Sequence, residues 1–142
     1  MTTFVHRRPV RIEWGDCDPA QIVFYPRYFA MFDGATQELF RAALGERKIE
    51  WVAKYGIIGI PMVDTRAKFI VPSRYGDDIV IESRVSRFGG SSFDIEHRVL
   101  REGDILAIEG FETRVWAGPD PAEPGAIKGY KIPAEVVAAF NR

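Results

Sequence analysis

Several features that define whole classes of protein are scarce or absent in this sequence. A single cysteine, Cys17, has no partner for an internal disulfide, which is typical of proteins from a reducing compartment. The longest uncharged apolar stretch, Tyr55–Val63, falls far short of the ~20 residues that span a bilayer. Residues 1–14 contain no apolar run followed by a small-residue cleavage site, as a secretory signal would. We therefore expect a cytoplasmic protein that does not insert into membranes.

Neither sign of charge is in clear excess. Lys and Arg number 19 and Asp and Glu number 20, a formal net charge of -1, so a globally basic surface for nucleic acid is not expected. Hydrophobic residues make up 46% and charged residues 27%, which excludes a disordered or fibrous chain. A length of 142 residues suits one core, and we expect one domain over residues 1–142.

Hydrophobic spacing predicts one long helix and several strands. Apolar residues recur every three or four positions between Pro26 and Gly45, the spacing of a helix with a wide apolar face. Shorter helices are expected over Arg47–Lys54 and from Pro133. Elsewhere the period is two, which is typical of strands. The expected strands are Val10–Trp14, Val63–Val71, Asp77–Arg87, Phe93–Val99, Ile105–Trp116 and Ala126–Ile132.

This order of elements predicts an α+β fold. Only the Pro26–Gly45 helix is long and apolar enough to cover the consecutive strands, so we expect an antiparallel sheet of about five strands wrapped around that helix. Such a sheet has two open edges and an outer face that one chain cannot cover. Apolar residues on both strand faces predict that a second subunit covers the outer face.

The segment from Gly15 to Tyr28 contains the candidate catalytic groups. Two carboxylates, Asp16 and Asp18, follow a strand and precede the N-terminus of the long helix, where free N–H groups stabilise negative charge. Because Pro26 has no N–H, the nearest upstream donor is the backbone N–H of Tyr25. A carboxylate beside such a donor suits hydrolysis of an activated acyl group. The alternative is that Asp18 only forms a turn or caps the helix.

No metal site is expected around Asp16 and Asp18, because hard cations need several further oxygen ligands and no acidic cluster at clear spacing supplies them.

The same segment resembles the signature of the hot-dog-fold thioesterases, in particular the 4-hydroxybenzoyl-CoA thioesterase group. The matching residues are Gly15, Asp16, Cys17, Asp18, Pro19, Ala20, Ile22, Val23, Phe24, Tyr25, Pro26 and Tyr28. Weaker similarity extends over most of the chain. The resemblance implies an acyl-CoA thioesterase that needs no cofactor or metal and assembles as a homodimer or homotetramer. It also implies that Asp18 is the catalytic nucleophile or general base and that the Tyr25 N–H polarises the thioester carbonyl.

Further residues are predicted to contact the substrate. Gln21 stands where the signature has glycine, at the mouth of the site. Aromatic residues, Phe24 among them, crowd the helix entrance and favour an aryl or short acyl group. Ile60 replaces a hydroxyl-bearing residue of the aryl pocket, which argues against a bond to a phenolic OH. Asp33, on the long helix, is expected to contact a polar group of the substrate and is also the rival catalytic acid.

The predicted CoA contacts lie near the Gly89-Gly90 turn, where the resemblance leads one to expect paired arginines. Arg87 is the nearest cation, and the backbone of Gly90 and Ser91 offers N–H groups to a phosphate.

Two other functions are open on the same fold. An acyl-CoA hydratase needs a His a few residues from its Asp, but no His lies between His6 and His97. His97 itself is interpreted as a hydrogen-bonded core residue. The remaining alternative is a non-catalytic module that binds acyl-CoA or acyl-carrier protein, which only measured turnover distinguishes from the enzyme.

Overall fold

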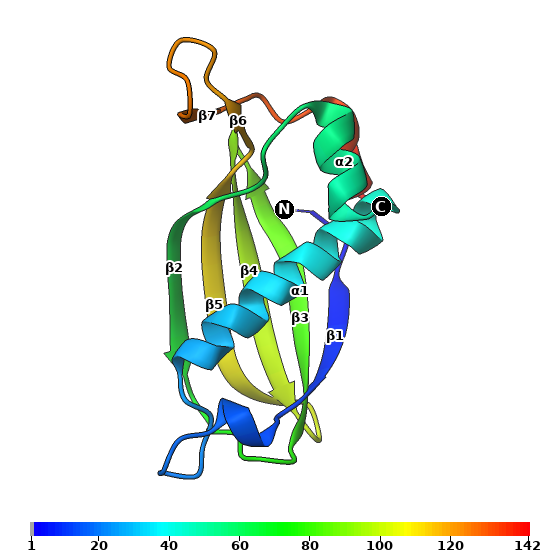
Figure 1. The fold of residues 1–142 in the computed structure, drawn as a ribbon. Coiled ribbons are helices and arrows are strands. Elements are labelled where there is room, and N and C mark those ends of the chain that lie inside the picture. The colour runs from blue at the N-terminus through cyan, green and yellow to red at the C-terminus, as the bar shows by residue number, and fades with distance from the viewer. Residues whose placement is uncertain (1) are drawn as a thin grey trace.

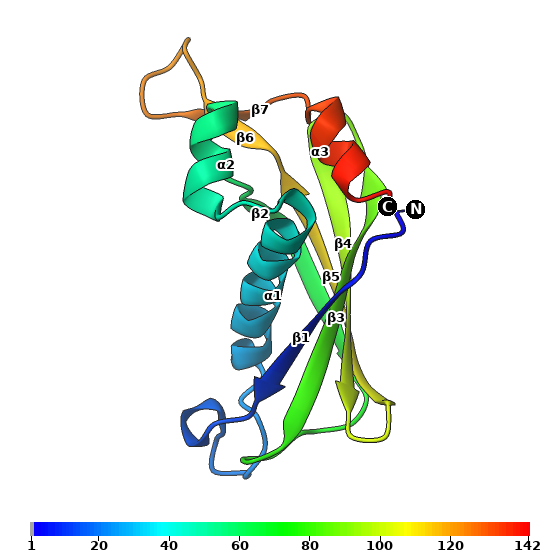
Figure 2. The same ribbon diagram turned by 90° about the vertical axis from the view of Figure 1, so that its right-hand side faces the viewer.

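The computed structural model describes residues 2–142 and contains the predicted sheet of five antiparallel strands around one long helix (Figure 1). The helix, α1 (Pro26–Leu44), crosses one face of the sheet diagonally, and Figure 2 shows that the other face has no helix over it. The strand order is β1-β3-β4-β5-β2. The strands are β1 (His6–Arg11), β2 (Met62–Phe69), β3 (Asp78–Phe88), β4 (Ser92–Arg101) and β5 (Ile105–Val115).

Helix α1 begins and ends where the sequence predicts. Pro26 occupies the first helical position, and Gly45 ends the helix at φ 71°, a left-handed conformation that glycine adopts without strain. The apolar stripe of α1 is buried against the sheet, and Phe32 within it is fully inaccessible. The ring of Phe32 lies over Gly110 of β5, where a Cβ atom would come within 2.9 Å of the ring. This close approach fixes the separation between α1 and the sheet.

Short helices and strands cover the end of the sheet at which β3 turns into β4, at the top of Figure 1. Helix α2 (Lys48–Tyr55) matches its prediction, and α3 (Ala134–Ala139) follows Pro133 as expected. The predicted strand Ala126–Ile132 is shorter, β7 (Ile127–Gly129), and pairs with a strand that the sequence did not indicate, β6 (Ala117–Pro119). These elements enclose a core in which the rings of Trp51 and Trp116 stack at 5.6 Å.

The first strand differs from its prediction. β1 ends at Arg11, and residues Trp14–Asp16 form a 3-10 turn, η1, so Trp14 does not share a buried strand face with Ile12. Ile12 is fully buried, whereas Trp14 is 77% exposed. The period-two pattern failed here because the chain leaves the sheet after Ile12, once its N–H has bonded to the Asp77 carbonyl.

The outer face of the sheet contradicts the expectation that it is apolar. On β1, β3 and β4, side chains of this face alternate in charge across neighbouring strands and form ion pairs between them. A face of this kind is stable in water and does not need a second subunit to cover it. The ion pairs are Arg7–Glu82, Glu82–Arg98, Arg84–Glu96 and Arg87–Asp94.

The exposed apolar surface lies instead along strand β2. This strand is an edge of the sheet, and Val63 and Phe69 are 63% and 48% exposed. β2 forms where a strand was predicted, but the predicted alternation of buried and exposed side chains is absent, because every residue of β2 except the half-buried Ala67 is exposed. Across residues 2–142, none of the helices has both the length and the apolar character to cross a membrane.

Candidate active site

The loop between η1 and α1 separates the roles of its two carboxylates. Asp16 accepts a hydrogen bond from the Glu13 N–H at 2.8 Å and closes the 3-10 turn. Asp18 is half-buried, and its Oδ1 accepts only the nearby N–H of Ala20, at 2.9 Å, within residues 2–142. Asp16 therefore stabilises the loop, whereas the second oxygen of Asp18 accepts no hydrogen bond within residues 2–142.

The backbone of this loop is tightly folded around Asp18. The Asp18 N–H donates to the Ile22 carbonyl at 3.1 Å, and the Gln21 N–H donates to the Asp18 carbonyl at 2.8 Å. Gln21 consequently has φ 68°, a conformation that disfavours any residue with a Cβ. This geometry explains why the signature has glycine here, and it shows that Gln21 replaces it at the cost of local strain.

Tyr25 is the residue immediately before α1. The N–H of Phe24 donates to Asp16, and those of Arg27 and Tyr28 donate to carbonyls within the first turn, at 2.8 and 3.0 Å. The Tyr25 N–H has no acceptor among residues 2–142, and Pro26 has no N–H. Tyr25 thus offers a free donor at a helix N-terminus, the position predicted from the sequence for binding an oxyanion.

Asp18 lies in the wall of a cleft of about 720 Å³. Gln21 lines this cleft too, together with the half-buried Cys17. Two further residues of the cleft, Arg74 and Tyr75, come from the connection between β2 and β3 and were not predicted to belong to the site. Only the fold brings this connection beside the Asp18 loop.

Phe24 belongs to an exposed aromatic group rather than to the Asp18 cleft. Its ring centroid lies 5.9 Å from that of Tyr25. The Tyr25 ring in turn lies 6.3 Å, centroid to centroid, from the ring of Phe69 at the end of β2. The start of α1 and the end of β2 therefore share one aromatic surface.

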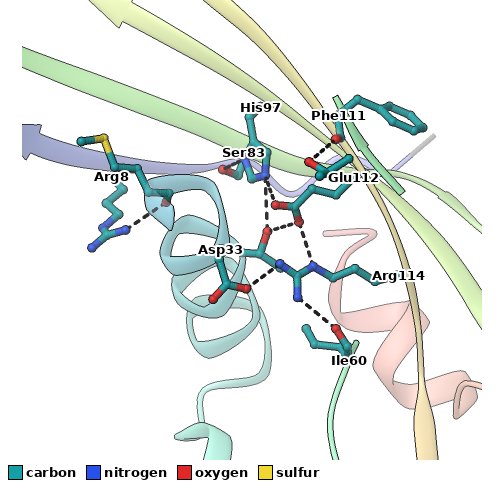
Figure 3. Close-up of polar contacts among 11 residues, drawn as sticks. Arg8, Asp33, Ile60, Ser83, His97, Phe111, Glu112 and Arg114 are labelled. Carbon is teal, nitrogen blue, oxygen red and sulfur yellow. Dashed lines mark hydrogen bonds and ion pairs between the residues drawn. The ribbon is translucent and has the colours of Figure 1, made fainter. Parts of the chain in front are cut away.

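Asp33 and Ile60 line a second cavity of about 420 Å³, next to the start of β2. The Asp33 carboxylate accepts a hydrogen bond from Nη2 of Arg114 at 2.7 Å, and Nη1 of the same guanidinium donates to the Ile60 carbonyl at 2.9 Å (Figure 3). Ile60 itself is 2% exposed and packs in the hydrophobic core, so the exposed apolar side chains of this cavity are those of Ile58, Met62 and Ile127. The structure thus places Asp33 and Ile60 together, as predicted, and adds Arg114 between them.

Behind Arg114 lies a fully buried polar network (Figure 3). Nε of Arg114 donates to Oε1 of Glu112 at 2.8 Å, and Thr36 donates to the same oxygen at 2.7 Å. Nε2 of His97 lies 3.2 Å from Oε2 of Glu112, and its Nδ1 shares a 2.7 Å hydrogen bond with Ser83. The interpretation of His97 as a hydrogen-bonded core residue is confirmed.

Hydrogen bonds and ion pairs favour the charged forms of Glu112 and Arg114 despite their burial. Burial raises the pKa of Glu112, but hydrogen bonds from His97 and Arg114 outweigh burial and hold that pKa below its usual value. Burial lowers the pKa of Arg114, but Glu112 and Asp33 outweigh it and raise that pKa. Neither Glu112 nor Arg114 was predicted from the sequence. Their signal was present, because Glu112 and Arg114 occupy inward positions in the period-two pattern of β5.

The predicted CoA contacts lie far from Asp18 within one chain. Arg87, Gly90 and Ser91 flank the β3–β4 turn, at the opposite end of the sheet from the Asp18 loop (Figure 1). Arg87 is already held by Asp94, through Nε at 2.8 Å and Nη2 at 3.3 Å. The structure therefore does not bring these three residues together with Asp18 and Tyr25.

Comparisons with known proteins identify the family. Residues 12–139 match the model of the thioesterase-like superfamily. A 4-hydroxybenzoyl-CoA thioesterase from Pseudomonas sp. strain CBS-3 is 34% identical over 131 residues, which cover 89% of this chain and 91% of that protein. An acyl-CoA thioesterase, YbgC, from Haemophilus influenzae is 26% identical and covers 94% of this chain and 92% of its own.

Solved structures agree with the sequence relatives. The Pseudomonas 4-hydroxybenzoyl-CoA thioesterase superposes with a TM-score of 0.86 at 31% identity, over 95% of this chain and 98% of its own. A gentisyl-coenzyme A thioesterase superposes with a TM-score of 0.79 at 31% identity, over 96% of this chain and 100% of its own. The predicted α+β hot-dog fold is confirmed.

Proposed function

The chain belongs to the thioesterase-like superfamily and is a thioester hydrolase; we propose that it hydrolyses aryl- or short-chain acyl-CoA at the loop that carries Asp18. The observation that carries this proposal is that one short loop holds a carboxylate with an unbonded oxygen and, at the start of α1, an N–H without an acceptor. Asp18 is bonded only to a neighbouring backbone group, and the Tyr25 N–H at the start of α1 has no acceptor among residues 2–142.

These two groups divide the chemistry of hydrolysis. The Tyr25 N–H, at the positive end of α1, stabilises the negative charge that develops on the thioester oxygen. The Asp18 carboxylate either attacks the carbonyl carbon, forming an anhydride that water then cleaves, or deprotonates the attacking water. In both routes the carbon–sulfur bond breaks and CoA leaves as a thiolate. No step requires a metal or a cofactor.

The cavity lined by Ile60 and Asp33 is the proposed acyl pocket. Its lining includes the exposed apolar side chains of Ile58, Met62 and Ile127, which suit an aromatic ring. Two similar proteins are named for hydroxybenzoyl- and gentisyl-CoA, whose acyl groups are hydroxylated rings. In this chain the Asp33 carboxylate is already engaged by Arg114, so we expect ring recognition to depend on shape more than on a bond to a hydroxyl group.

Strand β2 gives a reason for assembly as a dimer. It runs from the Ile60 cavity, at Met62, to the aromatic surface beside Tyr25, at Phe69 (Figure 1). Antiparallel pairing of two β2 edges would place the start of one strand beside the end of the other. The acyl pocket of one copy would then lie near Asp18 of its partner. Light scattering should give at least twice the 16.1 kDa chain mass, and a monomer at micromolar concentration would contradict this arrangement.

Hydrolysis of an acyl-CoA panel tests the proposed function. Release of free thiol from acetyl-, benzoyl- and 4-hydroxybenzoyl-CoA is measured with wild type and with Asp18→Asn. We expect turnover of at least one member by the wild type and its near-complete loss in the variant. Binding of the panel without turnover would contradict the proposal, and undiminished turnover by Asp18→Asn would remove Asp18 from the mechanism.

A further inference from the structure

Arg114 of β5 is a buried charge that the proposed hydrolysis does not use. Its side chain is 4% exposed, and that of its partner Glu112 is fully inaccessible. Taking two charges out of water costs so much free energy that apolar residues of the same volume often give equal or greater stability. Stability alone therefore does not explain this ion pair, and the other contacts of the guanidinium indicate what it does.

The guanidinium of Arg114 joins three separate segments of the chain (Figure 3). Nε donates to Glu112 of β5 at 2.8 Å, Nη1 donates to the Ile60 carbonyl at 2.9 Å, and Nη2 donates to Asp33 of α1 at 2.7 Å. Thr36 of α1 donates to the same oxygen of Glu112 at 2.7 Å. Because the donors of a guanidinium lie in one plane at fixed angles, these bonds hold their three acceptors in a fixed mutual arrangement.

Two of the three segments form opposite parts of the lining of the cavity proposed as the acyl pocket. Helix α1 contributes Asp33, and the segment that leads into β2, residues 57–62, contributes Ile58 and Met62. The backbone of this segment bonds to residues 52, 115 and 117. Within residues 2–142, its only hydrogen bond to a residue that also bonds α1 is the one from Arg114 to the Ile60 carbonyl. Arg114 is therefore the polar link between these two walls.

We propose that Arg114 is a positioning residue for the acyl pocket, which favours ring-sized acyl groups because Arg114 holds its two walls at a fixed separation. The inference rests on the proposed function, in which this cavity receives the acyl group. A gap of ~0.5–1 Å forfeits roughly a quarter to a half of a dispersion contact, so a ring that touches both walls loses binding when the walls shift. An acetyl group is too small to touch both walls. Disturbing Arg114 should therefore affect an aryl-CoA more than acetyl-CoA.

Selectivity between benzoyl-CoA and acetyl-CoA tests this role through two variants of Asp33. Asp33→Ala removes the acceptor on α1, whereas Asp33→Asn keeps an oxygen that can accept from Nη2. Neither acyl group has a hydroxyl group, so a bond from such a group to residue 33 does not contribute. We expect the ratio of kcat/KM for benzoyl-CoA to that for acetyl-CoA to fall about 5-fold or more in Asp33→Ala and to stay within about 2-fold of wild type in Asp33→Asn. The Asp33 side chain is 59% exposed, so both variants should fold.

A second pair of variants separates positioning from stability. Arg114→Lys keeps the charge but lacks the planar set of donors, and it should lower the same ratio about 10-fold or more, chiefly by raising KM for benzoyl-CoA. Ser83→Ala is the control, because it removes the bond to Nδ1 of His97 at the end of the buried network remote from Arg114. It should lower the thermal midpoint and leave the ratio within about 2-fold of wild type. A merely structural role would reduce the amount of folded enzyme and hence both activities equally.

An unchanged ratio in Asp33→Ala would overturn the inference whatever the stability of Arg114→Lys. An equal fall of the ratio in Ser83→Ala would overturn it too. If the wild type hydrolyses neither substrate, the proposed function fails. The ratio of the dissociation constants of the two intact acyl-CoA molecules, measured by calorimetry in the same variants, then tests the role of Arg114 separately.

Discussion

Asp18, just before α1, and Asp33, within it, are both partly exposed carboxylates, and the structure surrounds them differently. Asp18 accepts one hydrogen bond, from the backbone N–H of Ala20, and lies in the open cleft. Asp33 is 59% exposed and is bound at 2.7 Å by a guanidinium that is itself anchored in the core. The comparison teaches that exposure alone does not identify a reactive carboxylate. What distinguishes Asp18 is that no cation in residues 2–142 holds it in an ion pair.

The largest difference between the two sites should appear in stability, through Arg114→Met. Removing the guanidinium leaves the buried charge of Glu112 without its arginine partner, which typically costs about 3–5 kcal/mol. Asp18→Asn should change the free energy of unfolding by no more than about 0.5 kcal/mol, as expected for a surface site. Urea denaturation of both variants measures the difference. Equal stabilities would show that the Arg114 network contributes little.

Activity should rank the two aspartates in the opposite order. We expect Asp18→Asn to lower kcat by at least ~100-fold, which is typical of the loss of an acid–base or nucleophilic group. Asp33→Asn should lower kcat by less than about 10-fold, because Asp33 is proposed to shape the acyl pocket rather than to attack the substrate. Thiol release with benzoyl-CoA measures both, and the reverse ranking would transfer the catalytic role to Asp33.

Substrate choice tests whether Asp33 is as fully engaged as its ion pair indicates. A pocket built to bind a hydroxyl group rejects the analogue that lacks it, whereas an apolar pocket discriminates weakly. We therefore expect kcat/KM for 4-hydroxybenzoyl-CoA and benzoyl-CoA to differ by less than ~100-fold. A larger preference for the hydroxylated substrate would mean that a polar contact exists. In that case Asp33→Ala should abolish the preference.

The smallest expected effect concerns backbone strain. The loop that carries Asp18 contains a strained residue, whereas Asp33 lies in a regular helix. At φ 68°, Gln21 is in a conformation that costs a residue with a Cβ about 1–2 kcal/mol, partly offset because glycine loses more entropy on folding. Gln21→Gly should therefore stabilise the protein by up to about 1 kcal/mol. Gln21→Ala, which keeps a Cβ, is the control and should give no gain. Thermal melting of the two variants measures this, and equal midpoints would argue against strain at this position.

Local sequence patterns predicted the elements near the site well. The helix from Pro26 to Gly45 and the buried register of β3 and β4 followed from spacing, because a residue's face in a helix or strand depends only on its neighbours along the chain. The same locality allowed a twelve-residue signature to point to Asp18 and the Tyr25 N–H. It also explains the error at Trp14, since nothing local reveals that the chain leaves the sheet after Ile12.

The sequence by itself therefore determined the fold class, the family and the position of the candidate carboxylate, all of which depend on contiguous residues. Tertiary structure alone decided which charges are buried together. Arg114 meets Asp33 across 81 positions of the chain and Ile60 across 54, and Tyr75 reaches Trp14 from a different connection. Tertiary structure also placed the ion pairs between strands on the outer face of the sheet and the exposed apolar surface along β2. Strand pairing sets such contacts, and it depends on the free energy of the whole packed core rather than on any segment of the sequence.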